Sequence, residues 1–147
     1  MRLCSKLCSK LKLISILVPF WVLAPVGAHE IEISGNVAAM FHIEPNHNPK
    51  VGVPSKTWFA LTRRGGQIIP LSQCNCQLAV YSLPQKSKTP LLKPSLSSLN
   101  VERYRGVPGA TITFPQAGRY QLTLTGTPKS GANFQPFSLS YQVTVVR

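Results

Sequence analysis

The fold is decided by the stretch Gly118-Arg119-Tyr120-Gln121-Leu122-Thr123-Leu124-Thr125. Its apolar side chains, Tyr120, Leu122 and Leu124, alternate with polar ones, which is the two-residue period of a strand with one buried face. No helical period of any length interrupts this kind of alternation in residues 29–147. The stretch therefore predicts an all-β fold.

Similar alternation recurs on both sides of this stretch. We expect further strands at residues 30–33, 37–44, 57–62, 67–69, 74–83, 110–114 and 137–146. Residues 45–54 and 84–100 are rich in proline, so the first predicts a loop and the second a long, irregular crossing loop. About seven or eight short strands separated by turns indicate a β-sandwich.

A local motif specifies the kind of sandwich. Residues 114–122, Phe-Pro-Gln-Ala-Gly-Arg-Tyr-Gln-Leu, resemble the tyrosine corner of immunoglobulin-like and fibronectin-like domains. In that corner a Gly-x-Tyr begins a late strand, and the tyrosine hydroxyl reaches an upstream backbone group. Gly118 and Tyr120 hold those positions, so the resemblance implies an immunoglobulin-like β-sandwich.

The strand pattern also predicts which side chains form the core, because one face of each strand carries the apolar residues. The expected core residues are Ile31, Ile33, Val37, Phe41, Ile43, Trp58, Ala60, Leu78, Val80, Ile112, Phe114, Leu122, Leu124, Val143 and Val145.

The first 28 residues have the order of a secretory signal. Basic residues at positions 2, 6, 10 and 12 precede an apolar run at 13–24, and Pro25-Val26-Gly27-Ala28 ends in small residues. We expect a signal helix that is cleaved after Ala28, leaving one domain, residues 29–147, in the periplasm or an equivalent envelope compartment. The alternative is an uncleaved membrane anchor at residues 11–28, which is short for a membrane span and carries Pro19 and Pro25.

The predicted mature chain, residues 29–147, is similar to small exported bacterial sandwich domains of the YtkA-like and CopC-like type. The similarity consists of the signal segment, a histidine at the expected mature N-terminus and the closing Gly-x-Tyr-x-Leu strand at residues 118–122. Cys74-Asn75-Cys76 belongs to no motif of those families. Because copper binding is known in the CopC family, the resemblance implies a copper-related role.

Four residues are candidate metal ligands: His29, Met40, His42 and His47. After cleavage, His29 presents an α-amino group and an imidazole, which with a second histidine form a nitrogen chelate suited to Cu(II). Met40 and His42 point the same way from a strand, and a thioether beside an imidazole suits copper. The alternative is that these histidines are ordinary surface and loop residues.

Cys74 and Cys76 are the second candidate constellation. Thiols of an exported protein tend to oxidise, but residues i and i+2 of a flat strand lie roughly 6.5–7 Å apart, at the limit of a disulfide. A bridge therefore requires a bent backbone, and we expect such a bridge to be strained and easily reduced. A soft-metal pair and two separate thiols remain the alternatives.

Charge and missing motifs limit the function. Residues 29–147 keep twelve basic residues and four glutamates, a formal charge of +8, and contain no aspartate. No nucleophile elbow, zinc-protease motif or phosphate loop is present, and no basic stripe with interleaved aromatics indicates nucleic-acid binding. We therefore expect a non-enzymatic binding or accessory module of the cell envelope, with copper as the candidate cofactor. The alternative is a metal-free module whose basic surface binds an anionic envelope component or a membrane protein.

Overall fold

The computed structural model describes residues 30–84 and 87–147. The described elements are β1 (Glu30–Ser34), β2 (Val37–Ile43), β3 (Ser55–Arg63), β4 (Gln67–Ile68), the 3₁₀ helix η1 (Leu71–Gln73), β5 (Cys74–Ser82), β6 (Ser97–Val101), β7 (Tyr104–Ile112), β8 (Gly118–Pro128) and β9 (Phe137–Val145). None of these elements is a helix long and apolar enough to cross a membrane. The predicted signal segment, residues 1–28, lies outside the described residues.

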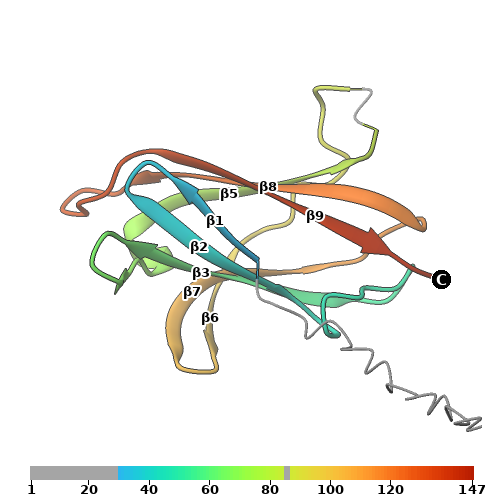
Figure 1. Cartoon of the computed structure of the whole chain (residues 1–147), viewed down its shortest axis with the longest axis horizontal. Helices are drawn as coiled ribbons and strands as arrows, with labels where there is room; N and C mark the ends of the chain where they lie inside the picture. The colour runs from blue at the N-terminus through green and yellow to red at the C-terminus, as the bar shows by residue number, and fades with distance from the viewer. Residues whose placement is uncertain (1–29, 85–86) are drawn as a thin grey trace, which may run out of the picture.

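The described strands form two antiparallel sheets that face each other (Figure 1). The larger sheet has the order β1-β2-β3-β7-β6, with β4 paired to β3, and the smaller sheet has the order β5-β8-β9. The predicted all-β sandwich is therefore confirmed.

The sequence pattern misses β6, which overlaps the end of residues 84–100, the segment predicted to be an irregular loop. Its sequence is Ser-Ser-Leu-Asn-Val, which lacks clear apolar alternation, and it becomes a strand by pairing with β7. Strand β7 is also longer than predicted, since it begins at Tyr104 and not at residue 110.

The main core lies between the two sheets. It contains buried side chains from β2, β3, β5, β7, β8 and β9, together with Phe114 from the segment after β7. The largest of these side chains are Phe41, Phe59, Phe114 and Tyr141. Thirteen of the predicted core residues are buried: Val37, Phe41, Ile43, Trp58, Ala60, Leu78, Val80, Ile112, Phe114, Leu122, Leu124, Val143 and Val145.

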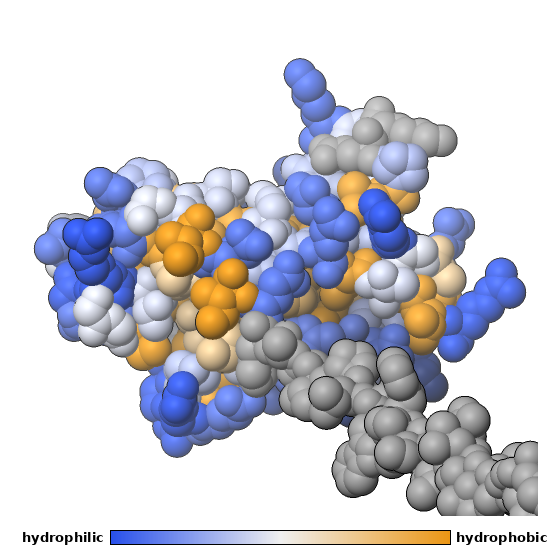
Figure 2. All heavy atoms as spheres, in the orientation of Figure 1, coloured by the Kyte–Doolittle hydropathy of each residue, from blue (hydrophilic) through white to orange (hydrophobic). Residues whose placement is uncertain are grey.

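The prediction was wrong for Ile31 and Ile33, which are 58% and 72% exposed. In the register of β1 with β2, Glu30 lies opposite Phe41 and Glu32 opposite Ala39, so the glutamates share the inward face. Strand β1 is a sheet edge, where an inward carboxylate still reaches water and discourages pairing with another chain. The isoleucines therefore point outward, and Figure 2 shows apolar side chains gathered over β1.

A second apolar cluster covers the outer face of the larger sheet. Trp58 and Ala60, predicted as core, belong to this cluster and not to the space between the sheets. The other buried members are Val101, Tyr104 and Val107 from the β6–β7 hairpin. Pairing of β3 with β7 ends at Trp58 and Gly109. Beyond that point β7 pairs with β6, and side chains of this hairpin pack on Trp58 and Ala60 of β3.

Two tyrosine hydroxyls bond to backbone oxygens, one nearby in the chain and one far along it. The Tyr120 hydroxyl donates a hydrogen bond of 2.8 Å to the backbone oxygen of Gln116, which confirms the predicted tyrosine corner. The Tyr141 hydroxyl donates a hydrogen bond of 2.9 Å to the backbone oxygen of Ala39, joining β9 to β2 across the sandwich. The Tyr141 ring stacks on Phe41 with centroids 4.8 Å apart.

Tyr141 makes stability depend on pH in the alkaline range. Burial raises the pKa of Tyr141 above its usual value, and the charges of Glu32 and Glu30 raise it further. Above pH ~10 the unfolded chain loses this proton while the folded chain keeps it, so stability is complete below that pH and falls as pH rises. We expect the loss in urea unfolding to steepen above pH ~10 and to approach about 1.4 kcal/mol per pH unit near pH ~11. Tyr141→Phe should flatten this slope. An unchanged slope in the variant would show that the pH dependence of stability does not come from Tyr141.

Candidate functional site

The candidate metal site lies at the end of β2 on the outer face of the larger sheet. His42 points to that face, and the following turn folds back so that the His47 amide donates to the Ile43 carbonyl at 2.9 Å. Asn46 and His47 adopt left-handed backbone angles, with φ of 48° and 57°. This tight turn brings the two imidazoles together edge to face, with ring centroids 4.8 Å apart.

Aromatic side chains hold the histidine pair in place. The His42 ring stacks on Trp58, its neighbour across the β2–β3 pair, with centroids 5.0 Å apart and an interplanar angle of 22°. The His47 ring meets the edge of Phe41 at 5.6 Å. Because Trp58 and Phe41 are buried and belong to two apolar clusters, both imidazoles rest on well-packed supports.

Met40 shares the outward face with His42 but has its own partner. The Tyr104 hydroxyl donates to the Met40 sulfur at 3.7 Å, and Met40 packs against the outer apolar cluster. The structure thus brings His42 and His47 together and places Met40 on the same face. His29 lies outside the described residues, and within residues 30–84 and 87–147 no three His, Cys, Asp or Glu side chains gather as a metal site.

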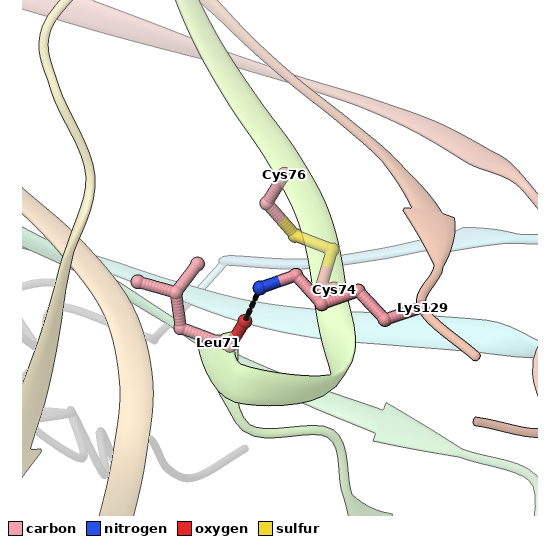
Figure 3. Close-up of a disulfide and its surroundings, with 4 residues drawn as sticks. All are labelled: Leu71, Cys74, Cys76 and Lys129. Carbon is pink, nitrogen blue, oxygen red and sulfur yellow. Dashed lines mark hydrogen bonds between the residues drawn. A yellow bond between two sulfur atoms is a disulfide. The ribbon is translucent and has the colours of Figure 1, made fainter. Parts of the chain in front are cut away.

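The two cysteines lie at the start of β5, in the other sheet. Their sulfur atoms are at the distance of a disulfide bond, and their Cα atoms are 5.2 Å apart, closer than in a flat strand (Figure 3). The backbone is therefore bent at this point, as the bridge requires. Cys74 is 2% exposed and Cys76 is half-buried, so an external thiol reaches Cys76 more readily.

Gly126 makes room for the two cysteines. The sequence pattern does not indicate this role of Gly126. Gly126 of β8 lies opposite Cys76 of β5 and opposite Phe137 of β9. A Cβ atom at this position would lie 2.5 Å from the Phe137 ring and 2.7 Å from the Cys74 sulfur. Position 126 therefore requires a glycine, because any side chain there would overlap both the Cys74 sulfur and the Phe137 ring.

Replacing Gly126 by alanine should destabilise the protein by about 1–3 kcal/mol, because the added methyl overpacks a buried contact. Urea unfolding of the wild type and the variant measures this loss. The penalty should be smaller in a Cys74→Ser/Cys76→Ser background, because the serine oxygen at position 74 is smaller than the sulfur that the added methyl would overlap. An equal penalty in both backgrounds would show that Phe137 alone sets the limit.

No family model, curated protein or solved structure matches this chain at a significant level. The resemblance of residues 29–147 to the YtkA-like and CopC-like domains therefore stays a prediction from the residues.

Proposed function

We propose that this chain is an exported, non-enzymatic binding module of the cell envelope that holds one copper ion through His42 and His47. The observation that carries the proposal is the approach of these two rings to a centroid distance of 4.8 Å. Imidazole nitrogen is a good ligand for copper, and a pair held by aromatic supports keeps its geometry before the metal arrives.

The other proposed ligands are His29 and Met40. Glu30 lies opposite Phe41, the neighbour of His42, and His29 is bonded directly to Glu30. After cleavage the His29 amine and imidazole would complete a nitrogen set with His42 and His47 that suits Cu(II). The Met40 thioether on the same face would favour Cu(I). To bind the metal, its sulfur would give up the hydrogen bond from the Tyr104 hydroxyl.

A second candidate function is a metal-free module that binds an anionic envelope component or a membrane protein. The observation that favours it is the poor neutralisation of the basic side chains. Among residues 30–84 and 87–147 one ion pair is formed, between Lys56 and Glu44 at 3.8 Å, with both side chains about half exposed. The remaining positive charge is available to attract an anionic partner.

The test of the main proposal is the native intact mass of the protein recovered from the envelope of its producing cells. A chain that begins at His29 and carries one copper ion supports the proposal. The same chain without metal, unable to take up one equivalent of Cu(II) or Cu(I) on titration, overturns it in favour of the second candidate. A mass that includes residues 1–28 excludes a copper chelate at the amine of His29.

A further inference from the structure

The outer face of the smaller sheet carries an array of neutral hydrogen-bonding side chains. In β8, Gln121, Thr123 and Thr125 point to this face, and across the strands Thr125 lies between Gln77 and Ser138. The Thr123 and Ser140 hydroxyls are 3.2 Å apart, as are the Gln121 amide nitrogen and the Thr123 hydroxyl.

Basic side chains border this array along its β5 edge. The four glutamates of the chain are at positions 30, 32, 44 and 102, so β5, β8, β9 and their connections contain none. Lys88 and Lys93 line a groove of about 670 Å³ together with Gln77, Tyr81 and Thr125. Arg119 is exposed at the start of β8. The face therefore attracts anions along its β5 edge, which is the edge away from Glu30 and Glu32 of β1 beside β9.

We infer that this face binds an acidic polysaccharide, with sugar hydroxyls on the Thr/Ser/Gln array and carboxylate groups at Lys88, Lys93 and Arg119. A sugar chain presents many hydroxyls, which pair with side chains that both donate and accept. Tyr81, half-buried on the same face, offers the edge or face of a ring to the apolar side of a sugar.

The same observations disfavour a lipid membrane as the partner. Docking to a bilayer gains most from apolar side chains that enter it, and the most exposed ones, Ile31 and Ile33, are on β1 of the other sheet. Beside this face the exposed large apolar side chain is Leu91, at 48%. The array is also independent of the proposed copper site, because His42 and His47 follow β2 in the larger sheet. Failure of either proposal leaves the other standing.

The test compares binding of the full-length chain, expressed and purified from the envelope, to polygalacturonate, to dextran and to phosphatidylglycerol vesicles at low and physiological salt. We expect binding to polygalacturonate that weakens with salt, and no binding to dextran. Lys88→Gln/Lys93→Gln/Arg119→Gln should weaken this binding at least ten-fold. The control variant Lys50→Gln/Arg64→Gln/Arg105→Gln removes the same charge elsewhere and should change it less than two-fold.

A neutral variant separates hydrogen bonding from charge. Gln77→Leu/Thr125→Val keeps the net charge and should weaken polygalacturonate binding at least three-fold, while its unfolding midpoint stays near that of the wild type. Equal losses in the two triple variants, or unchanged binding by the neutral variant, would overturn the inference. Vesicle binding as strong as polysaccharide binding would also overturn it and indicate an anionic lipid surface. Copper loading, measured on the same preparations, reports separately on the copper site.

Discussion

Replacement of Tyr141 by alanine is expected to lower the free energy of unfolding by about 3–5 kcal/mol, the range found for removal of a large buried aromatic ring. Tyr141 is fully buried and stacks on Phe41, and its ring centroid is 5.7 Å from that of Phe59. Truncation would leave a cavity between the sheets and would also remove the hydrogen bond to Ala39. For a domain of this size such a loss is a large fraction of the total stability.

Two further variants make this prediction specific. Tyr141→Phe keeps the ring, so it should cost only about 1–2 kcal/mol, the consequence of leaving the Ala39 carbonyl without its donor. Tyr81→Ala removes a tyrosine from the outer face of β5, where the ring is only half-buried, and should cost less than Tyr141→Ala. Urea unfolding at pH 7 measures all three. A cost for Tyr141→Ala below that for Tyr81→Ala would contradict the placement of Tyr141 in the core.

The second large effect concerns copper affinity. His42→Ala and His47→Ala should each weaken copper binding by roughly 100-fold or more, since each removes one of the two imidazoles that meet at 4.8 Å. An alanine inserted before His29 should weaken Cu(II) binding to a similar extent, because it separates the α-amino group from the imidazole. Competition titration against a chelator of known affinity measures these changes.

The matched control for copper binding lies in the same turn. Asn48 is exposed, and its backbone amide, not its side chain, donates to the Pro45 carbonyl at 2.8 Å. Asn48→Ala should therefore leave the turn intact and change copper affinity less than three-fold. If the two histidine variants bind copper as tightly as Asn48→Ala, the imidazole pair is not the copper site.

Local patterns were enough for much of the architecture. Strands such as β2, β5, β8 and β9 show alternation that depends only on neighbouring residues, so their existence and buried faces were predictable. The corner made by Tyr120 was predictable for the same reason, because its partner Gln116 is four residues away. The short separation of Cys74 and Cys76 likewise allowed the bridge to be considered from sequence.

Other features depend on contacts between residues far apart in the chain. The outward direction of Ile31 and Ile33 follows from the register of an edge strand, where alternation alone does not say which face is buried. Likewise, β6 depends on β7, and the space at Gly126 depends on three strands meeting.

For the candidate sites, the sequence by itself determined the chemical inventory: three histidines, a methionine beside one of them on a strand, and an acid-free second half apart from Glu102. Only the tertiary structure decided which members meet. It joined His47 to His42 through a reversed turn, placed the Met40 sulfur against Tyr104, and aligned Gln77, Thr125 and Ser138 in one row. Alternation along a strand is a local steric property, whereas these meetings depend on strand register and loop path, which are set by packing of the whole domain.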